Sequence, residues 1–249
     1  MDSADESKAT TNRPVEIFAT TRWTVVLAAG RPEAPRAAAA LEELCQTYWY
    51  PLYVYVRRHT STREDAEDLT QAFFAKFLEK NYLEDVSSDK GKFRAFLLAA
   101  LKHFLANEWD RANRQKRGGG VAILSLDWHD ADTRYQINPA DNLSPDKLYD
   151  RAWAVTLLGR VVNRLRCESE AEGKVKVFEL LKPFLTADKG AIPYATAATA
   201  LGWTEGAVRV TVHRLRRRYR LLLRDEISQT LADPSQAENE LQSLMSAFA

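Results

Sequence analysis

The stretch LGWTEGAVRVTVHRLRRRYR, from Leu201 to Arg220, predicts the turn and the second helix of a helix-turn-helix. Gly202 suits the left-handed conformation that ends a helix, and Thr204 suits the capping position of the next one. After this turn, apolar side chains recur at spacings of four and three, which predicts a helix with one stripe facing a core. They are Val208, Val212, Leu215, Tyr219 and Leu222.

The remaining surface of this predicted helix is strongly basic. Between Gly206 and Arg224 there are seven arginines and no Asp or Glu, which gives a formal charge of +7. Seven arginines without one carboxylate repel one another, so the segment calls for a polyanionic partner. A nucleic-acid phosphate backbone is the polyanion that we expect.

The overall charge of the chain hides this segregation. The 249 residues carry a formal net charge of only +1, and their number fits one or two domains with a sizeable core. The last twenty-five residues, Asp225 to Ala249, contain five acids and no Lys or Arg. Charge therefore has to be interpreted segment by segment.

Several classes of protein are disfavoured by what the chain contains. Cys45 and Cys167 have no disulfide or metal-site spacing, so we expect reduced thiols that are buried or unreactive. The polar start, Met1 to Pro14, has no basic-then-apolar pattern, and no apolar run approaches the roughly 20 residues of a membrane span. We expect a cytoplasmic protein without membrane contact, cofactor or metal. It is not expected to be an enzyme, because its four histidines are scattered and no nucleophile motif or phosphate loop occurs.

The helical periods and breaks divide the chain into five parts. Residues 1–19 are polar and predicted to be disordered. Residues 20–117 and 145–228 are predicted helical domains, and the stretch 118–144 between them is too long for an ordinary loop and is predicted to be a linker. Residues 229–249 form an acidic extension. The expected fold class is all-α, with two helical domains joined by a flexible linker and a helix-turn-helix in the second.

The segment TSTREDAEDLTQAFFAKFLEK, Thr60 to Lys80, predicts a helix with acids at its start. Ser61 or Thr62 is the expected cap. A core stripe follows at helical spacing, made of Ala66, Leu69, Phe73 and Phe77. The acids gather at one exposed end, where favourable interaction with the helix dipole explains them as well as partner binding does. They are Glu64, Asp65, Glu67 and Asp68.

A second basic segment, KFRAFLLAALKHFLANEWDRANRQKR, runs from Lys92 to Arg117. It holds seven Lys or Arg against two acids, a local excess of +5, with aromatic residues interleaved. Aromatic rings stack on unpaired bases while cations follow the backbone, so this composition suits single-stranded DNA. The same spacing also fits aromatic side chains that are simply part of a core.

Two further helices are predicted near the second domain. Ser144 and Pro145 suit the start of one, whose inward face we expect to be Leu148, Ala152, Val155, Leu158, Val162 and Leu165. After Pro234, an amphipathic acidic helix is predicted from Leu241, Leu244, Met245 and Phe248. It either folds back on a basic face, binds a regulator, or stays a disordered tail.

In this order, these segments resemble the extracytoplasmic-function (ECF) sigma factors of bacterial RNA polymerase. EDAEDLTQAFFAKFLE resembles their core-polymerase-binding helix and FRAFLLAALKHFLANEWDRANRQKR their promoter-melting segment. PYATAATALGWTEGAVRVTVHRLRRRYR resembles their reader of the upstream promoter element. With flanking helices, the resemblance covers roughly Leu41 to Arg117 and Leu148 to Arg224.

The resemblance implies three sets of contact residues. Core polymerase would meet Glu64, Asp65, Glu67, Asp68 and Gln71. The minus-ten element would be held by Phe93, Arg94, His103, Asn107, Arg111, Arg114, Lys116 and Arg117. The minus-thirty-five element would meet Thr204, Arg209, Thr211, His213, Arg214, Arg216, Arg217 and Arg218.

Three positions depart from the family pattern. Ala72 stands where a carboxylate is common, which weakens the polymerase-binding set. His103 stands where Asn is common near the pocket that, by the resemblance, holds a base flipped out of the minus-ten element. This departure bears on which base is recognised there. Val210 and Thr211 stand where a Ser-Arg pair is usual, so recognition should lean on Arg209 and Arg214.

The implied partners are core RNA polymerase and promoter DNA, with an anti-sigma factor or a regulatory kinase acting on Thr62 or Thr70 as further candidates. Two other functions remain open at this point. A dimeric helix-turn-helix regulator would explain the arginine helix alone. A sigma-like decoy that binds an anti-sigma factor would not need both basic segments.

Overall fold

The fold is all-α in a computed structural model that describes residues 37–79, 92–114, 135, 143–188, 190–231 and 233–248. Its α-helices are α2 (Ala37–Arg57), α3 (Arg63–Glu79), α4 (Phe93–Arg114), α6 (Pro145–Ala171), α7 (Val175–Leu181), α8 (Tyr194–Leu201), α9 (Glu205–Ser228) and α10 (Ala237–Met245). Short 3-10 turns follow α7, precede α10 and follow α10. The predicted disordered stretch 1–19 and most of the predicted linker 118–144 lie outside the described residues.

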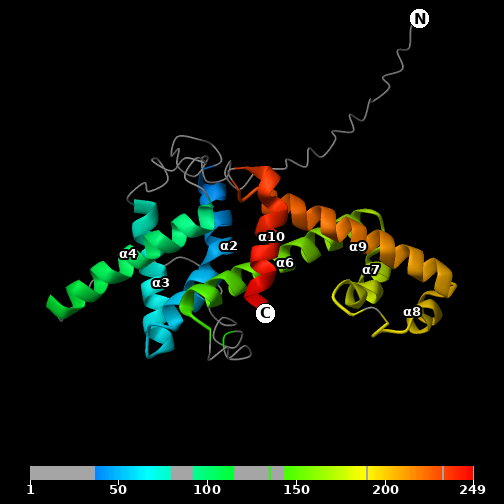
Figure 1. The fold of residues 1–249 in the computed structure, drawn as a ribbon, viewed down its shortest axis with the longest axis horizontal. Helices are drawn as coiled ribbons and strands as arrows, with labels where there is room; N and C mark the ends of the chain where they lie inside the picture. Colours follow the sequence, from blue (N-terminus) through cyan, green and yellow to red (C-terminus); the bar gives the residue numbers. More distant parts are fainter. Residues whose placement is uncertain are drawn as a thin grey trace, which may run out of the picture.

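Helix α6 is the longest described helix and packs against helices from both halves of the chain. Its 27 residues make it about 40 Å long. One part of it packs on α2 and another on α9, and Figure 1 shows it running from α2 past α10 towards α9. The helix starts where the sequence predicts, because the Ser144 hydroxyl caps it by accepting from the Lys147 amide at 3.4 Å. Helix α6 therefore joins the two halves of the chain.

The buried face of α6 agrees with the sequence prediction at Leu148, Ala152 and Leu165, with Leu158 and Val162 partly buried beside them, and differs from it at Val155. Val155 was expected to point inward but is 41% exposed, whereas Trp153 is 2% exposed. The centre of α6 is apolar on most sides, so periodicity alone selects no single face. The face is decided by packing against α2 on one side and α9 with α10 on the other. The residues that fill this contact are Leu148, Tyr149, Ala152, Trp153, Ala154, Leu157, Val161 and Leu165.

Helices α2, α3 and α4 pack together through aromatic side chains. Phe73 of α3 meets Phe104 of α4 edge-on at 5.7 Å between ring centroids, and Tyr48 of α2 meets Phe93 at 5.4 Å. The start of α3 is capped as predicted, because the Asp65 amide donates to the Thr62 hydroxyl at 3.1 Å. Burial of Ala66, Phe73 and Phe77 confirms the predicted core stripe of α3, and Leu69 packs partly buried beside it.

Most of the described helices contribute to one hydrophobic core. Buried side chains of α2, α3, α4, α6, α9 and α10 form a single cluster. A smaller cluster joins α7, α8 and the first half of α9, and consists of Leu181, Phe184, Ala197, Ala198, Val208 and Val212. The division into domains at 117 and 145 stays a prediction, yet α6 of the second predicted domain is buried directly against α2 of the first.

The acidic extension forms a docked helix. Leu244 of α10 is buried as the apolar rhythm predicts, and Leu241 packs partly buried against the core. Met245 and Phe248 are exposed, so the predicted apolar face is wrong at these two positions. Burial of α10 is completed instead by residues nearer its start, which makes the disordered-tail alternative wrong for the described part of the extension.

The two cysteines lie in different environments. Cys45 is buried on α2, where burial and then the charge of Glu42 raise the pKa of its thiol to about 11. This thiol stays protonated at neutral pH and is unreactive, as expected. Cys167 is exposed on α6, so the expectation of burial holds only for Cys45.

Truncation of Trp153 should expose the dependence of the fold on α6. We expect Trp153→Ala to lower the free energy of unfolding by about 3 to 5 kcal/mol, because it empties the contact between α6 and its neighbours. Val155→Ala on the same helix should change it by less than about 0.5 kcal/mol, because Val155 is largely exposed. Denaturant unfolding followed by circular dichroism measures both. Equal losses would contradict the assignment of the buried face.

Candidate functional site

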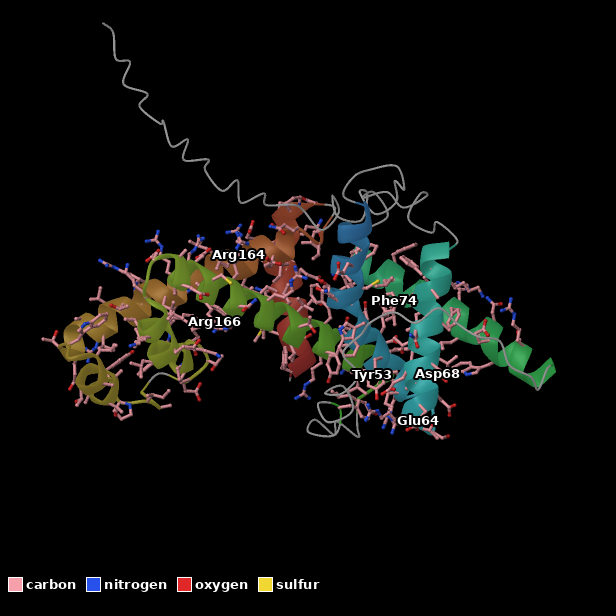
Figure 2. All side chains as sticks on the ribbon, turned by 180° about the vertical axis from the view of Figure 1, so that it is seen from behind. Tyr53, Glu64, Asp68, Phe74, Arg164 and Arg166 are labelled. Atoms are coloured by element: carbon pink, nitrogen blue, oxygen red, sulfur yellow. The ribbon has the colours of Figure 1, made fainter. Side chains whose placement is uncertain are left out.

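The acids at the start of α3 form the acidic surface of Glu64, Asp65, Glu67 and Asp68, in which Glu67 is half-buried and the other three are exposed. Figure 2 shows Glu64 and Asp68 towards the same end of α3. Asp65 accepts from the Thr62 hydroxyl at 2.6 Å, and Glu67 pairs with Arg63 at 2.5 Å. Among the described residues, no ion pair is found for Glu64 or Asp68. These two carboxylates are therefore the ones most available to a cationic partner.

The other residues considered on α3 are less accessible. Gln71 is half-buried. Thr70 is fully buried and its hydroxyl donates to the Ala66 carbonyl at 2.7 Å, so a kinase cannot reach it in this structure. Thr62 is exposed. Of the two threonines considered for phosphorylation, only Thr62 has an accessible side chain here.

The first two predicted contact residues of α4 lie inside the molecule. Phe93 is 1% exposed and packs edge-on against Tyr48, so its ring belongs to the core in this structure. Arg94, which the resemblance implies as a minus-ten contact, is 8% exposed and is engaged within the protein in this structure. Its Nε donates to Glu240 at 2.9 Å, its Nη1 pairs with Asp150, and its guanidinium lies 5.4 Å from the centre of the Trp153 ring. Two carboxylates make the burial of this cation tolerable.

The next three predicted residues of α4 share one exposed face. His103, Asn107 and Arg111 are exposed and follow one another at spacings of four, which aligns them along the helix. Asn107 Nδ2 donates to the His103 carbonyl at 2.9 Å, and Arg111 pairs with Glu108 at 2.9 Å. The side chain of Arg114, and all of Lys116 and Arg117, lie outside the described residues.

An aromatic group beside this face was missed by sequence reasoning. Tyr55 and His59 at the end of α2 have ring centroids 4.5 Å apart, and the Trp109 ring of α4 lies 6.0 Å from His59. Trp109 is 42% exposed. Lys102 lies 5.7 Å from the centre of the Tyr55 ring. The sequence shows only that Tyr55 and His59 are four residues apart. It does not reveal that Trp109 of α4 lies beside them.

The charge beside this aromatic group is held in place by a hydrogen bond. Lys102 Nζ donates to Asp146 at 2.9 Å, and this bond is the main cause that raises the pKa of Lys102 above its usual value. Burial of the amine acts in the opposite direction and is the smaller effect. Lys102 therefore remains a cation over the neutral range.

The turn between α8 and α9 has the conformation predicted from the sequence. Gly202 is left-handed with φ +66°, and the Trp203 amide donates to the Ala198 carbonyl at 2.9 Å across the end of α8. The Thr204 hydroxyl accepts from the Ala207 amide at 3.2 Å and so caps α9. The two predicted signals are confirmed, and together they fix the angle at which α9 leaves the turn.

The side chains predicted to face DNA on α9 divide into two groups. Arg209, His213, Arg214 and Arg217 are exposed, and Arg209 lies 5.4 Å from the centre of the Tyr194 ring. Thr211 is half-buried and its hydroxyl donates to the Ala207 carbonyl at 2.9 Å. The exposed group is free to meet an anion from outside.

Arg216 and Arg218 have partners within the protein. Arg216 donates to the carbonyls of Phe184 at 2.9 Å and Ala187 at 3.1 Å. Arg218 forms two hydrogen bonds to Glu168 of α6, at 2.9 and 2.6 Å, and the pKa of Arg218 is raised mainly by this contact. From the sequence, residues 216–218 were predicted to act together as DNA-binding cations. Nothing in the sequence indicates which of these guanidinium groups donates hydrogen bonds to the turn after α7.

The comparison with known families decides the identity of the chain. A family model described as ECF sigma factor matches residues 37–177, which run from α2 into α7. The chain belongs to the ECF sigma factor family. Sigma factors act in transcription initiation with core RNA polymerase and promoter DNA, and they are not a family of enzymes. No curated protein and no solved structure matches this ECF factor.

The described part of the chain also lacks two other kinds of feature. No group of three or more His, Cys, Asp or Glu side chains within it is arranged to hold a metal ion. None of the helices described is both long and apolar enough to cross a membrane.

The two groups of α9 arginines should respond differently to truncation. Arg216→Ala should lower the free energy of unfolding by about 1.5 to 3 kcal/mol, because two carbonyls lose a charged donor. Arg217→Ala should change it by less than about 0.5 kcal/mol, because this side chain is exposed. Thermal unfolding measures both. A stability loss in Arg217→Ala as large as that in Arg216→Ala would contradict the division.

Proposed function

We propose that this ECF sigma factor binds core polymerase through the acidic surface of α3 and directs initiation at a two-part promoter. In this proposal α4 and its surroundings hold the melted minus-ten element, and α9 reads the minus-thirty-five element. The protein works in the cytoplasm. An anti-sigma factor or a kinase that modifies Thr62 remains a candidate regulator.

The single observation that carries this proposal is the distribution of exposed charge in a chain of this family. Exposed carboxylates occur at the start of α3, and exposed cations occur on α4 and on the first half of α9. Figure 1 shows α4 and the start of α9 at opposite ends of the molecule. A bipartite promoter requires two separate readers, and exposed cations at two separate places, Lys102 and Arg111 on α4 and Arg209, Arg214 and Arg217 on α9, support this proposal.

The acidic surface supports docking to a basic partner. Complementary charge speeds and orients the encounter of two proteins. Glu64 and Asp68 are suited to this role because they are exposed and their carboxylates are not used within the described residues. Asp65, Glu67 and Gln71 flank them on the same helix, with Asp65 and Glu67 partly engaged by neighbouring side chains.

The exposed face of α4 supports binding of unpaired DNA. Extruding a base costs a few kcal/mol, which stacking and hydrogen bonds to its edge recover. His103 and Asn107 provide groups that hydrogen-bond, and Arg111 provides a cation. The exposed Trp109 ring beside His59 adds a surface on which a base can stack.

The first turns of α9 support reading of the major groove, which is wide enough to admit an α-helix. Arg209 and Arg214 are exposed there, and a guanidinium bound bidentately to guanine discriminates by about 1 to 3 kcal/mol. Arg217 suits a phosphate contact. Thr204 caps α9 by accepting from the Ala207 amide, which leaves its hydroxyl hydrogen able to donate to a DNA phosphate.

Run-off transcription with purified core enzyme tests the proposed function as a whole. We expect a promoter-specific product on templates selected from a random library by the reconstituted holoenzyme. Core enzyme alone on the same templates is the control. Absence of any specific product from every selected template would reject the sigma-factor role and favour a regulator or a decoy.

Paired substitutions test the division of labour between α3 and α9. The double variant Glu64→Lys with Asp68→Lys should weaken binding to core polymerase roughly tenfold, because like charges then oppose each other at the contact. Its promoter contacts should be unchanged. Arg209→Ala should weaken binding to the minus-thirty-five element by about 1 to 3 kcal/mol and leave polymerase binding intact.

Arg220→Ala is the matched control for Arg209→Ala, because Arg220 is exposed on the same helix but farther from the turn. Fluorescence anisotropy with labelled DNA and with labelled core enzyme measures both affinities. Equal losses of both affinities in both sets of variants would refute separate roles for α3 and α9.

A further inference from the structure

The C-terminal helix α10 inserts a carboxylate between two other helices. The side chain of Glu240 is 1% exposed. Its Oε1 accepts from Arg94 Nε at 2.9 Å, and its Oε2 pairs with Lys92 Nζ immediately before α4. Arg94 also pairs with Asp150 of α6. Glu240 thus occupies the position that an outside anion would need in order to reach Arg94.

The charges in this group cancel only when Glu240 is present. Lys92 and Arg94 contribute two positive charges, and Asp150 and Glu240 contribute two negative ones. If α10 leaves, the remaining three groups carry a net charge of +1. Two cations and one carboxylate then form a site that attracts an anion such as a phosphate.

Core packing and one cation–π contact hold α10 in this position. Ala237 and Leu244 are buried in the main core, and the guanidinium of Arg151 lies 5.8 Å from the centre of the Phe248 ring just after α10. The helix packs on both α6 and α9, and Figure 1 shows it crossing the middle of the molecule beside them. One short segment therefore contacts α4, α6 and α9 together.

These contacts hold a short element at the end of the described chain. A helix of nine residues is too short to be stable on its own in water, so α10 exists only while docked. In a buried ion pair, the cost of desolvation offsets much of the attraction between the charges. Short terminal elements with these properties open locally without unfolding the whole protein.

We propose that α10 is an intramolecular clasp, in which Glu240 occupies an anion site formed by Lys92 and Arg94 and keeps promoter phosphate out of it in the free protein. Release of α10 exposes the site to DNA. The DNA ligand rests on the function proposed above. The clasp itself rests on the contacts of Glu240.

Substitution of one acid on α10 tests the clasp in the full-length chain. Glu240→Gln keeps the size of the side chain but removes the charge that holds Lys92 and Arg94. Glu238→Gln is the matched control, because it removes an exposed acid from the same helix. Binding of each variant to a labelled promoter fragment is measured without polymerase, over a range of salt concentrations.

We expect Glu240→Gln to bind DNA roughly three- to tenfold tighter than Glu238→Gln, with a log–log salt dependence steeper by about 0.9, the value for one additional phosphate contact. Adding Lys92→Ala to Glu240→Gln should remove most of this gain. Equal affinities and equal salt slopes for Glu240→Gln and Glu238→Gln would overturn the clasp.

Hydrogen exchange of the unsubstituted protein provides a second measurement that does not depend on how the variants fold. Promoter DNA should accelerate amide exchange in residues 237–245, because DNA displaces α10. Unchanged protection of these amides at saturating DNA would overturn the clasp. Run-off transcription separates the two proposals. If the protein directs run-off transcription, but Glu240→Gln and Glu238→Gln bind DNA equally or the amides of α10 stay protected, the clasp is rejected and the proposed function is retained.

Discussion

The packing of α6 against two different partners is the constraint on which the rest of the structure depends. Tyr149, Trp153 and Val161 are buried in the same core as α2, and farther along the helix Arg164 pairs with Asp225 and Glu226 of α9 (Figure 2 labels Arg164). Because one rigid helix carries both contacts, α9 has a fixed position relative to α2, α3 and α4. The proposed readers of the two promoter elements are therefore held at a set distance in this conformation.

The arginines of this ECF factor fall into two groups, those that already bond to acceptors within the protein and those that remain exposed. Arg94, Arg216 and Arg218 each satisfy a carbonyl or carboxylate within the protein, while Arg209 and Arg214 remain exposed. A guanidinium that already has good acceptors gains little from a phosphate, because the first contact has to be broken. The effective DNA-binding charge is consequently smaller than the sequence count of +7, because Arg216 and Arg218 are already engaged within the protein.

Local features of this fold could be predicted from the sequence, and long-range contacts could not. The caps at Thr62 and Thr204 involve groups three residues apart, so their signals are contained in short stretches. The pair of Arg94 and Glu240 spans 146 positions and depends on how α10 docks, which no spacing reveals. The buried face of α6 also depended on its partners. The exposed acids of α3 were correctly predicted as a surface feature, whereas their binding partner needs experiment.

The two cysteines differ in accessibility, which allows a fluorophore to be attached selectively to one of them. Cys45 is buried and its thiol stays protonated at neutral pH, whereas Cys167 is exposed near the end of α6. Because these are the two cysteines of the chain, a thiol-reactive dye should attach to the native sequence at a single position. That position lies one residue before Glu168, the partner of Arg218. A fluorophore there would report on the seam between α6 and α9 without any engineered residue.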